Sequence, residues 1–177
     1  MSQLKKQTIA KLKKQLGAKR NLFSLPRLTK VVINYRCSDA RDNHQLLEVA
    51  GDEVMAITGQ KPRLVPAKKS VANFKLKAGQ PLAYKATLRG CRMYDFIEKL
   101  SALVLPRLRD FQGIAVKSFD DQGNYNMVIH DQTYFPEINL DKAVKIRSVQ
   151  ISLAIAAPSK KEAKMLLSAL GFPFQKK

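Results

Sequence analysis

Acidic residues are scarce in this 177-residue chain, in which 14 aspartates and glutamates face 32 lysines and arginines. The resulting formal net charge of +18 repels itself within a compact chain and attracts polyanions, nucleic acid first among them. Long apolar runs are also missing, since no stretch reaches the roughly 18 residues that a spanning helix needs. The N-terminus is basic and lacks the uninterrupted apolar segment of a secretory signal. We therefore expect a cytoplasmic protein, while an organellar location stays open.

Tryptophan is absent and aromatic residues amount to 7%, so stacking on single-stranded bases is not expected as the main mode of binding. The two cysteines, Cys37 and Cys91, make no disulfide framework and no zinc-binding spacing. The two histidines, His44 and His130, belong to no metal-binding or catalytic motif, and no phosphate-binding glycine motif occurs. The sequence thus predicts neither an enzyme nor a cofactor or metal site.

The positive charge is not spread evenly along the chain. Ten basic residues precede the first acidic one, Asp39, and a second acid-free segment from Val54 to Tyr94 holds nine more. Because a solvated surface normally mixes the two signs, these segments indicate the contact surface for a polyanion. The apolar content of 45% is ordinary and suffices for a buried core, which we expect in a single domain over residues 1–177.

Apolar periodicity and turn residues predict the order of the elements. Helices are expected at 3–17, 40–58 and 91–105 and after a capping box of Ser159 and Glu162, and strands at 28–36, 81–90, 114–118, 125–129 and 148–156. Residues 59–81 hold three prolines and two glycines and are predicted to form a long functional loop. Turns are expected at 120–124 and 135–142.

This order predicts an α+β fold, a mainly antiparallel sheet with helices packed on one face. The other face is expected to stay open and to carry basic and small polar side chains, namely Asn34, Arg36, Lys85, Thr87, Arg89, Ser148, Gln150 and Ser152. Arginine and lysine can take phosphates, whereas amides and hydroxyls bond sugars and base edges. A protruding basic loop at about 68–80, which includes Phe74, is also expected to contact an anionic partner. The basic helix at 3–17 is expected either to dock on the core or to contact RNA.

Several stretches occur together in a specific order: LPRLTKVVINY (25–35), ITGQKPRLVPAKKSVANFKLKAGQPLAYKATLRGCRMYDFIEKL (57–100), PRLRDFQGIAVKSFDDQGNYNM (106–127), FPEI (135–138) and LLSALGFPF (166–174). Together they cover nearly the whole chain. In this they resemble the family of the fifth large-subunit ribosomal protein, the universal binder of 5S ribosomal RNA.

The resemblance implies a structural constituent of the large ribosomal subunit that acts in translation. It implies binding of 5S rRNA, which is anchored in the central protuberance, and contacts with 23S rRNA, peptidyl-site tRNA, other proteins of the central protuberance and a protein of the small-subunit head. The family's positions for direct RNA bonding correspond to Asn34, Gln60 and Thr87. Charge and position add further rRNA-binding candidates, which are Arg36, Lys68, Lys69, Lys85, Arg89 and Arg92.

The loop that the resemblance directs toward the tRNA elbow holds Asn73, Lys75 and Lys77. Lys75 and Lys77 are expected as its charged tips. Asn73 stands where the family usually has glycine, and asparagine tolerates a left-handed backbone better than most residues.

Three other functions are weighed at this point. An RNA chaperone or assembly factor would bind ribosomal RNA only transiently. An enzyme acting on RNA would need catalytic groups that the sequence does not offer. A membrane-surface protein would use the basic amphipathic helix at 3–17, but its apolar face is modest and has no Trp or Phe, which favours docking on the core or contact with RNA.

Overall fold

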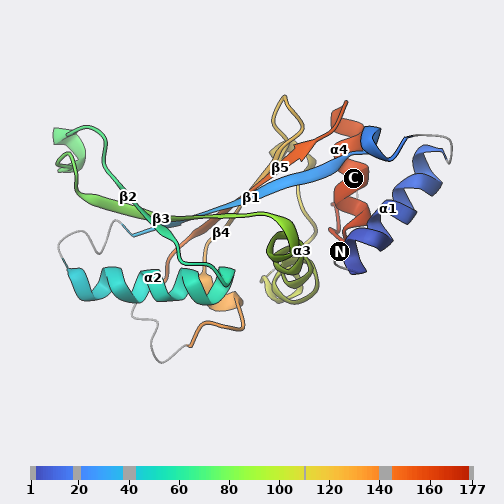
Figure 1. The fold of residues 1–177 in the computed structure, drawn as a ribbon. Helices are drawn as coiled ribbons and strands as arrows, with labels where there is room; N and C mark the ends of the chain where they lie inside the picture. Colours follow the sequence, from blue (N-terminus) through green and yellow to red (C-terminus); the bar gives the residue numbers. More distant parts are fainter. Residues whose placement is uncertain (1–2, 18–20, 38–42, 110, 140–144, 176–177) are drawn as a thin grey trace. The chain divides into compact units, whose positions relative to one another are not determined.

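The computed structural model describes residues 3–17, 21–37, 43–109, 111–139 and 145–175. Within these ranges the chain forms four α-helices and one five-stranded sheet (Figure 1). The helices are α1 (Gln3–Leu16), α2 (His44–Thr58), α3 (Gly90–Lys99) and α4 (Lys160–Ala169). The strands are β1 (Arg27–Arg36), β2 (Arg63–Pro66), β3 (Pro81–Leu88), β4 (Tyr125–Ile129) and β5 (Val149–Ala156), in the order β2-β3-β1-β5-β4.

The sheet is antiparallel, as predicted. Between β2 and β3, Arg63 pairs with Lys85 and Val65 with Ala83. Between β1 and β5, the Thr29 hydroxyl donates to the carbonyl of Ala154 at 2.9 Å, and further along β1 the Asn34 amide faces Gln150 at 3.5 Å. Residue numbers thus rise along one strand as they fall along its neighbour. These strands and helices confirm the predicted α+β class.

The chain divides into two compact units, which we call unit 1 (Met1–Val31, Leu88–Met127 and Ser152–Lys177) and unit 2 (Val32–Thr87 and Val128–Ile151). Four strands, β1, β3, β4 and β5, pass from one unit into the other. A single-domain organisation over the whole chain stays a prediction.

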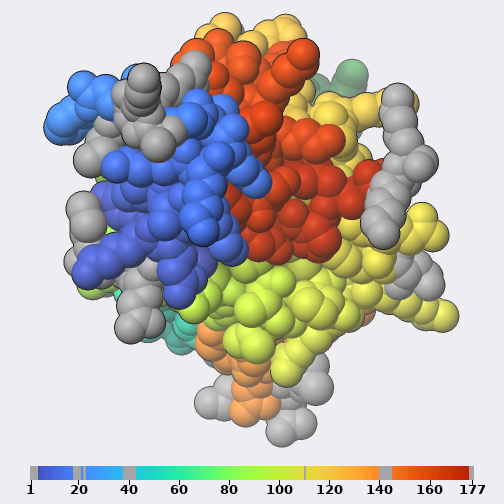
Figure 2. All heavy atoms as spheres, turned by 90° about the vertical axis from the view of Figure 1, so that its right-hand side faces the viewer, coloured from blue at the N-terminus to red at the C-terminus, as the bar shows by residue number. Residues whose placement is uncertain are grey.

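Unit 1 is built around three helices. Helix α1 contacts both α3 and α4, and Figure 2 shows α1, in blue, against α4, in red. Leu12 of α1, Ile97 of α3 and Leu167 of α4 are each at most 1% exposed. The predicted capping box starts α4, since the Ser159 hydroxyl oxygen accepts the N–H of Glu162. The apolar stripes read from the sequence therefore form this core.

Unit 2 packs one helix against its strands. In β1, Ile33 and Tyr35 are fully buried, while Asn34 between them is half-buried and turned to the other face. Helix α2 buries Ala50, Val54 and Ile57. It ends at Gly59, whose φ of +64° is the left-handed conformation that favours glycine.

Two predicted boundaries differ from the structure in this unit. Helix α2 begins at His44, where the Asn43 side chain accepts the N–H groups of Gln45 and Leu46. Residues 40–42 of the predicted helix lie outside the described residues. The predicted loop 59–81 contains strand β2, which sequence reasoning missed. The missed strand has four residues ending in Pro66, too short for an alternation to be recognised, and it exists through its pairing with β3.

The strand predicted at 114–118 is wrong. Ile114 makes only an isolated parallel bridge to Phe174, and Val116–Ser118 form a 3-10 turn. Gly113 allows the two segments to approach, because a Cβ at this position would lie 2.7 Å from the Phe174 backbone. A 3-10 turn at Gln132–Tyr134 directly precedes the turn predicted at 135–142, of which residues 140–142 lie outside the described residues. The predicted helix 91–105 is α3, which continues as a π-helical turn at Leu100–Val104.

A buried ionic network joins β1, α2 and the segment before β5 in unit 2. The Tyr35 hydroxyl donates to Oε2 of Glu53, and Nη1 of Arg147 lies 3.3 Å from the same oxygen. Glu53 is 8% and Arg147 4% exposed. Burial, followed by the neighbouring Glu53 carboxylate, raises the pKa of the Tyr35 phenol, so the phenol remains the proton donor. The side-chain oxygen Oε1 of Gln132 accepts the backbone N–H of Arg147 at 2.5 Å and so extends the network.

We predict that Arg147→Met lowers the free energy of unfolding by about 3–5 kcal/mol, because it leaves the Glu53 carboxylate buried without its cation. Denaturant unfolding of the purified chain measures this. Lys160→Met is the matched control, since the Lys160–Asp121 pair is shorter, at 2.8 Å against 3.3 Å, but its side chains are 52% and 98% exposed. That variant should change the free energy of unfolding by less than about 1 kcal/mol. Equal losses in both variants would contradict the assignment.

Candidate nucleic-acid interface

The strands of unit 2 present a polar face opposite their buried one. On β1, Asn34 and Arg36 alternate with buried Ile33 and Tyr35. On the neighbouring strand β3, Lys85 and Thr87 alternate with buried Ala86. Arg36 and Lys85 are exposed, whereas Asn34 and Thr87 are half-buried. Two adjacent strands thus place cations beside groups that form directed hydrogen bonds, as predicted from their alternation.

The amide groups on this face are held loosely. Nε2 of Gln60, just after the cap of α2, donates to the carbonyl oxygen of Thr87 at 3.4 Å. Nδ2 of Asn34 lies 3.5 Å from Oε1 of Gln150. Both contacts are at the long end for hydrogen bonds. Asn34 is therefore positioned by its strand and Gln60 by the end of α2, and both can exchange these weak contacts for bonds to a ligand.

Arg63 is a functional candidate that the predicted site missed. In the β2–β3 register it lies directly opposite Lys85, so both cations project from the same face of the sheet. Both side chains are exposed. Like charges placed opposite each other destabilise a free sheet, and a bound polyanion would relieve this repulsion. The only sequence signal was membership of the acid-free segment, because strand β2 was not predicted.

The basic loop after β2 is an ordered hairpin. Its base is closed by Ala67, whose N–H donates to the carbonyl of Gln80 at 2.8 Å and whose own carbonyl accepts from Gly79 at 2.9 Å. Val71 and Leu76 exchange two backbone hydrogen bonds nearer the tip, of 3.0 and 3.1 Å. Lys68 and Lys69 lie along one arm, and both are exposed. These bonds fix the loop's shape, which a solvated connector would not require.

At the tip of this hairpin the left-handed residue is Lys75, with φ of +49°, and not Asn73, where the glycine of the family suggested it. The 3-10 turn Ala72–Phe74 ends at Lys75, whose N–H returns to the Ala72 carbonyl at 2.9 Å. Asn73, Lys75 and Lys77 are all exposed. Phe74 is 70% exposed, so the tip combines an aromatic ring with two ammonium groups.

The remaining predicted residues, Arg89 and Arg92, belong to unit 1. Arg89 caps the start of α3 in extended conformation and Arg92 lies in its first turn. Both side chains are exposed. They are thus available to an anion from this unit.

The described part of the chain holds no cluster of metal-binding side chains. None of its His, Cys, Asp and Glu side chains come together in groups of three or more that could hold a metal ion. His44 and His130 are exposed, Cys91 is exposed and Cys37 is buried. Among the described helices, none has the length and apolarity to cross a membrane. The α+β fold and its cationic, polar sheet face are typical of proteins that bind nucleic acid.

Comparison with known proteins gives the family. The profile of ribosomal protein L5 matches residues 21–77, and the profile of the C-terminal part of the same ribosomal family matches residues 81–174. Large ribosomal subunit protein uL5 of Thermoanaerobacter sp. (strain X514) is 46% identical over 171 residues, 97% of this chain and 95% of that protein. The uL5 protein of Bdellovibrio bacteriovorus is 47% identical over 165 residues, which cover 93% and 92% of the two chains. The uL5 protein of Chloroflexus aggregans is 46% identical over 156 residues, which cover 88% and 87%.

The chain therefore belongs to the uL5 family of ribosomal proteins. It is a structural constituent of the large ribosomal subunit, works in translation, binds ribosomal RNA as a ribosome-bound protein and is not an enzyme. Its partners are ribosomal RNA and other components of the ribosome.

We predict opposite effects of Arg63→Gln on stability and on binding. Removing one of two opposed cations should raise the free energy of unfolding of the free protein by about 0.2–1 kcal/mol. The same change should weaken binding to large-subunit rRNA and flatten the plot of log affinity against log salt by about 0.9 for each lost phosphate contact. Arg107→Gln, at an exposed arginine of unit 1, is the control for net charge. A salt slope unchanged by Arg63→Gln and lowered by the control would contradict the site.

Proposed function

We propose that the polar sheet face of unit 2 binds 5S ribosomal RNA and anchors it in the central protuberance of the large subunit. The observation that carries this is the placement of Asn34, Gln60 and Thr87. Gln60 contacts the backbone of Thr87, and Asn34 lies on the strand next to it. These are the residues that the family resemblance assigns to direct RNA bonding, and the fold gathers them in one unit.

The chemistry of this face suits structured RNA. The cations Arg36, Arg63 and Lys85 would neutralise phosphates, and the amides of Asn34 and Gln60 would bond sugar hydroxyls and base edges. Phosphate contacts fix the position of the protein, while amide and hydroxyl contacts distinguish one RNA site from another. A sheet surface reads the shape of a folded RNA without needing a groove that admits a helix.

Asn34→Ala and Thr87→Ala should each weaken binding to 5S rRNA by about 1–2 kcal/mol, because each removes a hydrogen-bonding group from a desolvated contact. Filter binding or calorimetry against 5S rRNA, with unrelated tRNA in excess, measures the affinity. Thr29→Ala is the control, since this strand threonine already donates to the Ala154 carbonyl in unit 1. Undiminished affinity in the double variant Asn34→Ala, Thr87→Ala would remove the sheet face from the proposal.

We also propose that the ordered hairpin of residues 67–80 contacts the elbow of peptidyl-site tRNA. Its hydrogen-bonded shape, its exposed Lys75 and Lys77 and the exposed ring of Phe74 support this, because charge and a planar face together suit a tRNA loop.

Contacts with 23S rRNA, with other proteins of the central protuberance and with a small-subunit head protein complete the proposed role. The proposed setting is the cytoplasmic ribosome, and the proposed organisation is one domain with a basic N-terminal helix, consistent with bacterial relatives that align over nearly their whole length.

Replacing Lys75 and Lys77 together by Gln should weaken the contact with peptidyl-site tRNA and leave 5S rRNA binding nearly unchanged, because these cations belong to the hairpin and not to the sheet face. The tRNA contact is measured as tRNA retention on ribosomes that carry the variant. Lys68→Gln with Lys69→Gln, on the arm of the same hairpin, removes equal charge away from the tip. Loss of 5S binding by the tip variant, with tRNA retention intact, would place the tip on 5S rRNA instead.

A further inference from the structure

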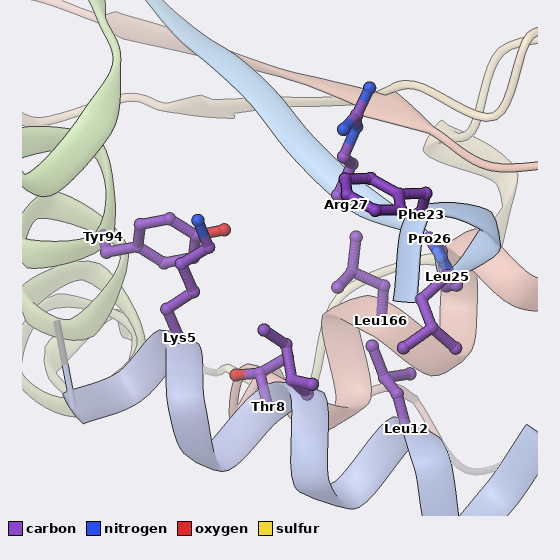
Figure 3. Close-up of a pocket in the computed structure, with 10 residues that line it drawn as sticks. Lys5, Thr8, Leu12, Phe23, Leu25, Pro26, Arg27, Tyr94 and Leu166 are labelled. Atoms are coloured by element: carbon purple, nitrogen blue, oxygen red, sulfur yellow. The ribbon is translucent and has the colours of Figure 1, made fainter. Parts of the chain in front are cut away.

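Unit 1 contains a groove of 290 Å³ that the proposed 5S and tRNA contacts do not use (Figure 3). Leu12 of α1 and Leu166 of α4 form its apolar floor. Lys5 and Tyr94 lie at one end, and Phe23 and Arg27 lie at the other. All of these residues belong to unit 1.

Phe23 is the most exposed of the large hydrophobic residues identified in the structure, at 84%. It is not on a loose loop. The Asn21 side chain accepts the N–H of Phe23 at 3.2 Å, and the Asn21 carbonyl accepts both the N–H and the hydroxyl of Ser24, at 3.1 and 2.8 Å. A hydrogen-bonded turn therefore holds an aromatic ring in solvent. Exposing this ring costs hydrophobic free energy in the isolated protein, which a planar partner would recover.

The two cations of the groove lie beside the aromatic rings. Nζ of Lys5 is 5.9 Å from the centre of the Tyr94 ring. The exposed Arg27 extends from the start of β1 at the same end as Phe23. Burial raises the pKa of the Tyr94 phenol, so its hydroxyl keeps its proton and can donate as well as accept. The groove thus combines planar faces, hydrogen-bonding capacity and positive charge.

Charge and size restrict what can occupy it. The residues that line the groove include Lys5 and Arg27 and no carboxylate. Helix α1 beside it adds Lys6, Lys11, Lys13 and Lys14, again without an acidic residue. Such a density of cations is matched by the closely spaced phosphates of a nucleic acid. The volume of 290 Å³ lies at the lower end of small-ligand pockets, about 300–1,000 Å³, so it suits one planar group and not the side chains of a docked helix.

We propose that this groove binds one unpaired base of large-subunit ribosomal RNA. The base stacks on the Phe23 ring and the neighbouring Arg27 guanidinium, and the flanking phosphates are bound by Arg27 and Lys5. Splayed-out bases are commonly bound in this way, between aromatic rings and guanidinium planes. This inference rests on family membership and does not depend on the proposed 5S and tRNA contacts.

The direct test replaces Phe23 by a benzophenone amino acid in the full chain, assembles it into large subunits and irradiates them. The expected product is a crosslink to ribosomal RNA, mapped by reverse transcription to an unpaired nucleotide. A crosslink to a neighbouring protein alone would overturn the proposal in favour of an acidic peptide. The absence of any crosslink would overturn it as well.

A binding series separates stacking from charge. Phe23→Ala should weaken binding to deproteinised large-subunit rRNA by roughly 5- to 150-fold, the range expected for loss of one base–aromatic stack. Phe23→Tyr, which keeps the ring, should bind nearly as the wild type. Val116→Ala, at an apolar residue of the same unit that is 47% exposed, is the control. Wild-type affinity for Phe23→Ala, or an equal loss for Val116→Ala, would overturn the proposal.

Failure of the groove proposal can be distinguished from failure of the proposal that the sheet face binds 5S rRNA. Asn34→Ala and Thr87→Ala test 5S binding by unit 2, whereas Phe23→Ala changes only unit 1. If Phe23→Ala has no effect while the sheet variants weaken 5S binding, only the groove proposal fails. The reverse result leaves the groove standing and removes the sheet face.

Discussion

Each strand of this protein can bury only one of its two faces, and the rest of the structure depends on this constraint. In β1, burying Ile33 and Tyr35 turns Asn34 and Arg36 to the opposite face. The same period of two in β3 buries Ala86 and turns out the residues on either side of it. A one-residue slip would put the cations into the core, where unpaired charges are not tolerated. The packing of α2 therefore also fixes the composition of the polar face.

One of the few carboxylates, that of Glu53, is buried inside unit 2. Glu53 directly precedes the acid-free segment that begins at Val54. Inside unit 2 it is the partner of Arg147 and Tyr35. It joins α2 to the segment before β5, so one carboxylate orders parts of the chain 94 residues apart. An apolar replacement of the whole network could be equally stable, but removing one member leaves the other charge buried. The network thus restricts the arrangement of unit 2 more than it adds to stability.

The positive charge that the protein's own carboxylates do not neutralise is compensated by its RNA partner. Arg63 and Lys85 face each other across two strands, and α1 carries five lysines and no acid. A ligand that binds only the folded chain stabilises it by mass action, so ribosomal RNA supplies counter-charge that the chain itself lacks. Stability of the free protein and affinity for RNA are consequently linked through the same side chains. The exposed rings of Phe23 and Phe74 fit the same relation, because a complex would bury ring surface that the free protein leaves in water.

Much of this protein was determined by local sequence. Alternation fixed β1, β3 and β5, and the capping Ser159 and the terminal Gly59 fixed two helix ends, because periodicity and caps act within a few residues. The polar face that carries Asn34 and Thr87 followed from that alternation, and their use in RNA binding remains a prediction. Tertiary structure alone decided the rest: strand β2 and the opposition of Arg63 and Lys85, the single bridge at Ile114 in place of a strand, and the buried Glu53–Arg147 pair. These features depend on which distant segments meet, and no pattern within one segment contains that information.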